Sequence, residues 1–390
     1  MYPVSKRGHV RSQDGERGHR MRNFMMKAMT GTSVIALAGA AHAQDEPFDL
    51  GSIILRGELQ ERTLQDTQSS VAVVTGEELE QGGDQELYDV IARTPGVTAT
   101  QGEQGFAIRG INQRGVQAGT GLTISIQVDG VALPTNESSF FGPYSVWDLD
   151  QIEIYRGPQS TQQGRNALAG AIVIRTKDPS YAQDASIRAE YGSRDFYRLA
   201  VMANTPLVQD RLAFRFSAVT QREDGFVFNP TLNTPYDPSS IDELRFKLRW
   251  NPTDRFEAIL SHSITDNFGG EDFIEEAFLP ARINRSDILS FEGSRHRNTG
   301  LRLSYEFANG NVIEYEGNHY LNRYNRQEDF DFSPRPLGFL AAGGGSTVVE
   351  HEVRYRFETE RVKGVFGAFY TDIDNSLPST LNGDLGFSLS

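Results

Sequence analysis

The segment QIEIYRGPQSTQQGRNALAGAIVIRTKDP (Gln151–Pro179) decides the fold of this chain. It predicts two short strands, 152–154 and 171–176, because β-branched apolar residues gather at both places and Lys-Asp-Pro follows the second. The polar turn between them contains residues that restrict or free the backbone: Gly157, Pro158, Gly164 and Gly170. We therefore expect a strand–turn–strand unit here.

Two motifs upstream also combine an apolar strand with a glycine, namely FAIRGI (Phe106–Ile111) and ISIQVDGV (Ile124–Val131). In this order the three stretches resemble the plug domain of the TonB-dependent outer-membrane receptors, whose pattern runs IRG, VDGV and DLxxIEVxRGPQxxxxGxxAxGGxIxIxTKxP. The resemblance extends from about Ser52 to Pro179, and Ala169 stands where a second glycine is more usual. It assigns these residues to the plug motif: Gly110, Asp129, Gly130, Glu153, Gly157, Pro158, Gly164 and Gly170.

Two arginines of these motifs, Arg109 and Arg156, stand at strand ends immediately before a glycine. The resemblance implies that they meet glutamates on the barrel wall and latch the plug in place. A buried arginine needs such a carboxylate, because an unpaired charge is costly in a low dielectric. The alternative is that both arginines only cap strand ends at a hydrated surface.

The amino-acid composition excludes several classes of partner and of active site. The 390 residues carry a formal net charge of −14, which argues against nucleic acid as a partner. The absence of cysteine excludes disulfides, thiolate zinc sites and cysteine nucleophiles in this sequence. No P-loop or G-x-S-x-G motif is present, and the histidines follow no metal-binding spacing, so we expect neither an enzyme nor a resident metal or cofactor. Calcium at the acidic runs 271–276 and 328–331 remains an alternative to simple solvated loops.

Residues 1–43 are predicted to be a leader and secretory signal. A basic start, a short apolar run (34–41) and Ala41-His42-Ala43 predict cleavage before Gln44. The apolar run is far shorter than the ~20 residues that a membrane-spanning helix needs. The polar residues 1–20 suggest a true start at Met21 or Met25.

Residues 44–58 are predicted to be a flexible segment that contains a TonB box. In the resembling family this box adds as a strand to a TonB-type periplasmic energising protein, and an ordinary edge strand of the plug is the alternative. The predicted box comprises Ser52, Ile53, Ile54, Leu55, Arg56 and Gly57. Since no signalling domain fits between Gln44 and Ser52, a transporter is expected rather than a signal transducer.

Residues 59–179 are predicted to form the plug, a small α+β domain. Thr75-Gly76-Glu77-Glu78 is a capping box that predicts a helix start. Asp84 is the expected N-cap of a second helix that stops at Thr94-Pro95-Gly96.

From Ala185 the sequence alternates with period two, and residues 183–390 are predicted to be the N-terminal part of an antiparallel transmembrane β-barrel. In ELRFKLRW (243–250), Leu, Phe and Trp alternate with charged residues, which indicates lipid outside and a watery lumen inside. A soluble sandwich is the alternative.

Connections in this part alternate between short and long, as in barrels with periplasmic turns and extracellular loops. The short ones are 205–211, 251–255, 308–311 and 358–361, and the long ones are 223–242, 266–297 and 325–346. About nine strands are expected of the roughly 22 that plugged transporters have, so the barrel is incomplete, from a fragment or a truncated gene.

The sequence therefore predicts import of a scarce nutrient across the outer membrane, most simply a ferric siderophore. The alternatives are a carbohydrate or cobalamin importer, or a truncated surface receptor that binds without transporting.

Overall fold

The computed structural model describes residues 54–55, 57, 62–100, 105–113, 122–135, 138–139, 142–159, 166–270, 281–359, 361–376 and 379–382. Residues 1–53, and with them the predicted signal peptide, lie outside the described residues. No helix in the described ranges has the length and apolar character to cross a membrane.

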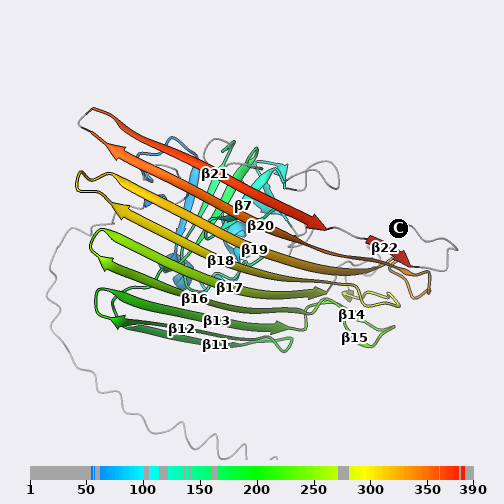
Figure 1. Ribbon diagram of the computed structural model, residues 1–390. Coiled ribbons are helices and arrows are strands. Elements are labelled where there is room, and N and C mark those ends of the chain that lie inside the picture. The colour runs from blue at the N-terminus through cyan, green and yellow to red at the C-terminus, as the bar shows by residue number, and fades with distance from the viewer. Residues whose placement is uncertain are drawn as a thin grey trace, which may run out of the picture. The chain divides into compact units, whose positions relative to one another are not determined.

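The largest sheet is antiparallel, and its long strands lie side by side in chain order (Figure 1). Its strands are β11 (Asp184–Tyr191), β12 (Tyr197–Val208), β13 (Leu212–Glu223), β16 (Ser239–Thr253), β17 (Phe256–Gly270), β18 (Phe291–Glu306), β19 (Val312–Asp329), β20 (Phe339–Glu358) and β21 (Lys363–Ser376), with β22 (Ser379–Asn382) paired to β20. The loop between β13 and β16 adds a small hairpin of β14 (Phe228–Asn229) and β15 (Thr234–Pro235). Along the path β11 to β21 the described sheet thus has the expected nine strands.

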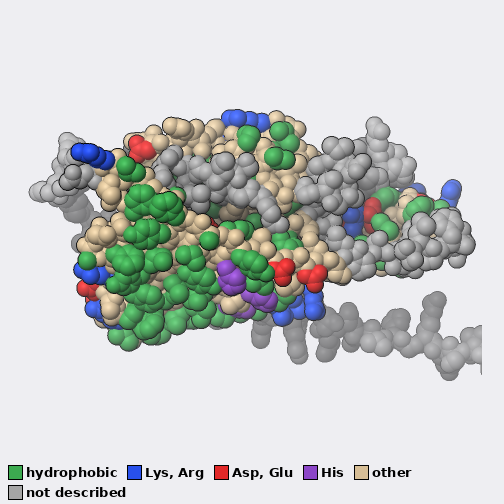
Figure 2. Space-filling model, turned by 45° about the horizontal axis from the view of Figure 1, so that its top comes forward, with side chains coloured by type: hydrophobic (Ala, Val, Ile, Leu, Met, Phe, Trp, Pro, Cys, Tyr) green, Lys and Arg blue, Asp and Glu red, His purple; other side chains and the backbone are tan. Residues whose placement is uncertain are grey.

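Burial in this sheet is inverted relative to a soluble protein. In β16, Phe246 and Trp250 are 39% and 49% exposed, whereas Arg245 and Lys247 are each 8% exposed. The outward surface is accordingly covered with hydrophobic side chains (Figure 2). Apolar residues outside and charged residues inside are the arrangement of a membrane barrel, which confirms the predicted fold class.

The short connections lie where they were predicted. The long connections are shorter than predicted, because the strands on either side extend into them. β17 continues to Gly270 and β18 begins at Phe291, inside the predicted loop 266–297. β19 and β20 have 18 and 20 residues, whereas a span needs about 9–11. Backbone pairing thus continues past the residues whose hydrophobic alternation set the predicted strand ends.

The described residues between 62 and 176 form a small α+β unit, which we call the plug. Its main sheet has the order β3-β9-β10-β7-β8, in which β10 is antiparallel to β9 and parallel to β7. The bounds are β3 (Val71–Thr75), β7 (Ile124–Val128), β8 (Val131–Ala132), β9 (Leu149–Arg156) and β10 (Gly170–Thr176). A second sheet contains β4 (Val97–Ala99), β5 (Phe106–Ile108) and β6 (Ile111–Asn112).

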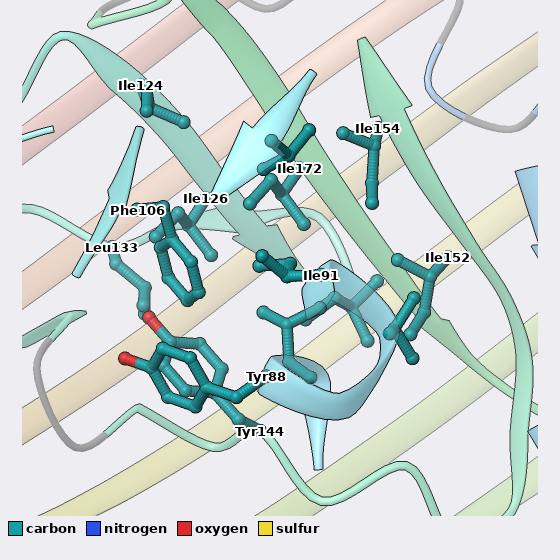
Figure 3. Close-up of a cluster of buried hydrophobic side chains, with 14 of the residues drawn as sticks. Tyr88, Ile91, Phe106, Ile124, Ile126, Leu133, Tyr144, Ile152, Ile154 and Ile172 are labelled. Carbon is teal, nitrogen blue, oxygen red and sulfur yellow. The ribbon is translucent and has the colours of Figure 1, made fainter. Parts of the chain in front are cut away.

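The plug has its own apolar core between these sheets and two short helices. Ile152, Ile154 and Ile172 point into it from β9 and β10, and the rings of Tyr88, Phe106 and Tyr144 meet in it (Figure 3). Tyr88 stacks on Phe106 with ring centroids 4.8 Å apart. The same apolar cluster includes Tyr320 of β19 and Val348 of β20, so apolar contacts also join the plug to the barrel strands.

The helices are α2 (Gly76–Gly82) and α3 (Leu87–Ala92). The predicted capping box of α2 is confirmed, since Glu78 N donates to Thr75 Oγ1 (3.3 Å) and Thr75 N donates to Glu78 Oε2 (2.8 Å). The prediction of Asp84 as the N-cap of α3 is wrong. Glu86 occupies that position, and Asp84 instead pairs with Arg93 at the other end of the helix (2.5 Å).

Candidate coupling site and plug–barrel interface

The predicted TonB box is docked on the plug where the structure describes it. Ile54 and Leu55 form β1 (Ile54–Leu55), which pairs antiparallel with β2 (Arg62–Thr63). The Leu55 side chain is buried at 1% exposure. Ser52, Ile53 and Arg56 of the predicted box lie outside the described residues.

The Glu153 carboxylate is the centre of this docking site. Glu153 is fully buried and accepts hydrogen bonds from Gly57 N (3.0 Å), Gln151 Nε2 (2.5 Å) and Tyr155 Oη (2.5 Å). Gln151 Nε2 also donates to the Ile54 carbonyl (3.0 Å). The side chains of β9 therefore hold the box segment at two places.

Alternation along β9 explains this arrangement. Ile152 and Ile154 face the apolar core, so Gln151, Glu153 and Tyr155 must share the opposite face. The sequence QIEIY already indicates this face, but only the fold shows that Ile54 and Gly57, about a hundred positions away, lie against it.

The two arginines of the predicted latch bind atoms of the plug. Arg109 Nη2 donates to Ser70 Oγ (3.1 Å), and Arg156 Nη1 donates to the Pro95 carbonyl (3.0 Å). Within the described ranges neither arginine forms an ion pair with a barrel carboxylate. The latch through Arg109 and Arg156 therefore stays a prediction.

The predicted latch has arginines on the plug and carboxylates on the barrel. Most of the described plug–barrel ion pairs have the carboxylate on the plug and the cation on the barrel. Asp148 of the plug forms a two-pronged pair with Arg215 of β13, with Arg215 Nε 2.9 Å from Asp148 Oδ2. Both side chains are at most 7% exposed. Nearby, Trp147 Nε1 donates to the Val201 carbonyl of β12 (3.0 Å), and Arg245 donates to the Trp147 carbonyl.

A second cluster surrounds Lys247 of β16. Its Nζ lies 3.0 Å from Asp178 Oδ1, 3.6 Å from Asp129 Oδ2 and 3.0 Å from the Thr176 carbonyl. Arg302 of β18 also pairs with Asp178. Burial by itself would raise the pKa of both aspartates. At Asp178 the charges of Lys247 and Arg302 outweigh burial, and at Asp129 the charge of Lys247 and the hydrogen bonds from Thr176 outweigh it. The pKa of each aspartate is therefore lowered from the ordinary value of 3.8.

The VDG turn brings the plug close to the wall. Asp129 accepts hydrogen bonds from Thr176 N (3.0 Å) and Thr176 Oγ1 (2.6 Å), which ties β7 to the end of β10. Gly130 has φ 88°, and a Cβ there would lie 1.8 Å from Glu316 Oε1 of β19. Glu316 Oε1 is also 3.6 Å from Arg175 Nη1 of the plug. In this ion pair the cation is on the plug and the carboxylate is on the barrel, as the latch prediction expects.

The remaining motif residues serve the plug backbone. Gly110 and Gly157 have φ of 80° and 125°, which only glycine adopts without strain, and Pro158 is exposed after them. Gly170 makes β10 fit against β9, since a Cβ would lie 2.2 Å from the Tyr155 carbonyl oxygen. Gly164 lies outside the described residues.

Sequence reasoning placed the charged residues of 243–250, among them Arg245 and Lys247, on the lumen side but missed their partners. The charge pattern gives the face of each strand, whereas the partner depends on how the plug is seated. Among the described residues no group of three histidines, aspartates or glutamates is arranged to hold a metal ion.

The known proteins to which this chain is similar are outer-membrane receptors. A family model described as the TonB-dependent receptor plug domain matches residues 63–171. The ferrioxamine B receptor of Salmonella typhimurium is 24% identical over 268 residues, 68% of this chain and 34% of that protein.

Solved structures show the same fold. The ferric yersiniabactin uptake receptor of Yersinia pestis matches with a TM-score of 0.72 at 20% identity, over 82% of this chain and 50% of that one. The ferripyoverdine receptor of the Pseudomonas aeruginosa outer membrane matches with a TM-score of 0.68 at 17% identity, over 85% and 46%. The chain thus spans about half or less of the length of these relatives.

Proposed function

Because this chain belongs to the TonB-dependent outer-membrane receptors, with a plug domain at residues 63–171 and barrel strands after it, we propose that the receptor containing it imports a ferric siderophore. A TonB-type periplasmic protein binds the segment 52–57 by strand addition and pulls on it. The relatives that bind ferrioxamine, yersiniabactin and pyoverdine support this class of cargo.

The observation that carries the proposal is the docking of Ile54 on Gln151 and of Gly57 on Glu153. These side chains belong to β9, which pairs with both β3 and β10 in the plug sheet. A force on the box segment therefore acts directly on the plug sheet. Ion pairs and hydrogen bonds form much of the plug's contact with the wall, and water can replace these as the plug moves.

Two other functions are kept as alternatives. An importer of carbohydrate or cobalamin would use the same coupling site with another cargo. A surface receptor without energy coupling would bind cargo but need no box. A substitution in the box distinguishes the uncoupled surface receptor from an importer, because only the importer needs the box.

The test is Ile54→Pro in the receptor that contains this chain, with Ile54→Val as the matched control. Proline removes a backbone donor from the strand that the partner would extend, whereas valine keeps both the donor and the extended preference. We expect uptake of radioactive iron with a hydroxamate or phenolate siderophore to fall to background in Ile54→Pro, while cells still bind the ferric complex. Undiminished uptake would exclude coupling through this segment.

A further inference from the structure

The three long connections of the large sheet are bound to one another. We call them the first, second and third loop, and their described parts are 224–238, 281–290 and 330–338. The β14–β15 hairpin of the first loop lies at this end of the strands (Figure 1). Phe228 N of the first loop donates to the Arg282 carbonyl of the second (3.0 Å), and Asp287 N of the second donates to the Ser333 carbonyl of the third (3.1 Å). The second loop is therefore held on both sides.

Ser290 joins all three loops at one point. Its hydroxyl accepts a hydrogen bond from Tyr236 Oη of the first loop (2.8 Å). It accepts another from the backbone N–H of Asp329 (2.9 Å), which is the last residue of β19 and stands where the third loop begins. Ser290 and Tyr236 are completely buried, and Asp329 is 1% exposed. This junction is thus closed to water, and a charge inside it is costly.

The Asp329 carboxylate lies in the junction without a cation. Its Oδ1 accepts a hydrogen bond from Asp331 N (3.2 Å), whereas its buried Oδ2 has no hydrogen-bond partner among the described residues. Asp287 Oδ1 and Asp331 Oδ1 are also buried and without a hydrogen-bond partner there. No described lysine, arginine or histidine forms an ion pair with these aspartates, and Arg326, three positions before Asp329, pairs with other carboxylates. The junction therefore has buried acceptors and lacks a donor.

These surroundings favour the protonated form of Asp329. The titratable groups that face it are Tyr236 of the first loop, Asp287 of the second and Asp331 of the third. Burial raises the pKa of Asp329 above the ordinary value of 3.8, and the charges of Asp331 and Asp287 raise the pKa further. A protonated carboxyl removes one negative charge and supplies the donor that the junction lacks.

We propose that a proton on Asp329 clamps the three long loops together and that its loss loosens them. In the ionised form three carboxylates repel one another where the loops meet, and they belong to two different loops. A proton fits this cluster better than a metal ion, because no group of three carboxylates in the described ranges is arranged to hold one. The inference rests on the packing of the loops and not on import.

The direction of the pH dependence follows from the raised pKa. The proton stabilises the closed junction fully below the ordinary aspartate pKa of about 3.9, and this stability is lost as the pH rises through the pKa of the folded protein. Because opening releases one proton, the open population should increase up to about tenfold per pH unit between these two pKa values and then level off.

The test is hydrogen–deuterium exchange of the purified receptor from about pH 4 to pH 8, expressed as protection factors so that the intrinsic pH dependence of exchange cancels. In peptides from 282–290 and 327–333 we expect protection to fall with rising pH, by up to about tenfold per unit, and then to level off. Asp329→Asn should keep protection high at every pH, because the amide is neutral and supplies a donor. Asp195→Asn is the matched control, since Asp195 is exposed and its turn contacts the start of the first loop through Arg194.

A flat profile in the unaltered receptor would overturn the proposal, and this measurement needs no variant. A pH dependence that persists unchanged in Asp329→Asn would overturn it as well. Full protection at pH 8 on addition of calcium alone would show that the cluster takes a metal ion in place of a proton. Iron uptake is a separate measurement, so a failure of the clamp leaves the proposed import untouched.

Discussion

Asp148 and Glu153 are two buried carboxylates of the plug with different partners. Asp148 faces Arg215 of the barrel, so it holds the plug against the wall. Glu153 receives hydrogen bonds from its neighbours on β9 and from Gly57, so it holds the box against the plug. The first contact resists movement of the whole plug, and the second lies where the proposed pull is applied.

Replacement of Asp148 by Asn should loosen the plug more than Arg156→Ala. The neutral amide would leave the Arg215 charge buried without its partner, which costs about 3–5 kcal/mol. Arg156→Ala removes a hydrogen bond to a carbonyl, which is worth about 1 kcal/mol. Reactivity of a thiol introduced at the buried Ser125, together with antibiotic sensitivity of whole cells, measures plug opening. Greater opening in Arg156→Ala would instead support the latch expected from the motif.

At the level of elements, the close pairing of β9 and β10 fixes the plug. Seven residue pairs join these strands, from Gly170–Arg156 to Thr176–Leu149. The tight contact begins at Gly170, where the chain passes the Tyr155 carbonyl and the Ile108 side chain at distances that exclude a Cβ.

Gly170→Ala should therefore destabilise the plug by about 1–3 kcal/mol or more, since backbone must move to admit the methyl group. Gly343→Ala is the control, because its Cβ would meet nothing closer than 3.6 Å. Protease resistance of the plug in the purified receptor measures the effect. Equal resistance of the two variants would contradict the packing seen at β9 and β10.

At the scale of the whole molecule, the plug and barrel are joined by charges that depend on pH. The pKa values of Asp129 and Asp178 are lower in the folded protein than the ordinary value of about 3.9. A lowered pKa contributes stability that is complete above the unfolded value and is lost as the pH falls through the folded value. The Lys247 cluster should thus hold the plug fully above about pH 5 and release it progressively below pH 4.

Trp147 fluorescence provides the measurement, because this buried side chain lies at the plug–barrel contact. In a receptor in which Trp250 and every other tryptophan except Trp147 are replaced by phenylalanine, we expect a red shift of emission on acidification below about pH 4. Asp178→Asn should reduce the amplitude of that transition. An identical transition in this variant would show that other groups control the release.

The sequence by itself determined the fold class, the nine strands of the described sheet, the inward and outward faces and the similarity to the TonB-dependent receptor plug domain. Those features follow from local order: periodicity of two, glycine and proline at turns, and the RGP motif. The sequence did not identify the N-cap of α3, which is Glu86 and not Asp84. Several polar residues near a helix start can cap it, and packing selects one of them.

Only the tertiary structure decided which charges meet. Asp148 and Arg215 are 67 residues apart, and Gly57 and Glu153 are 96 apart. No local pattern encodes such pairs, because an ion pair depends on the relative position of two separately folded surfaces. The sequence therefore predicted a charged lumen, whereas the seating of the plug against the strands determined that its aspartates bind barrel cations.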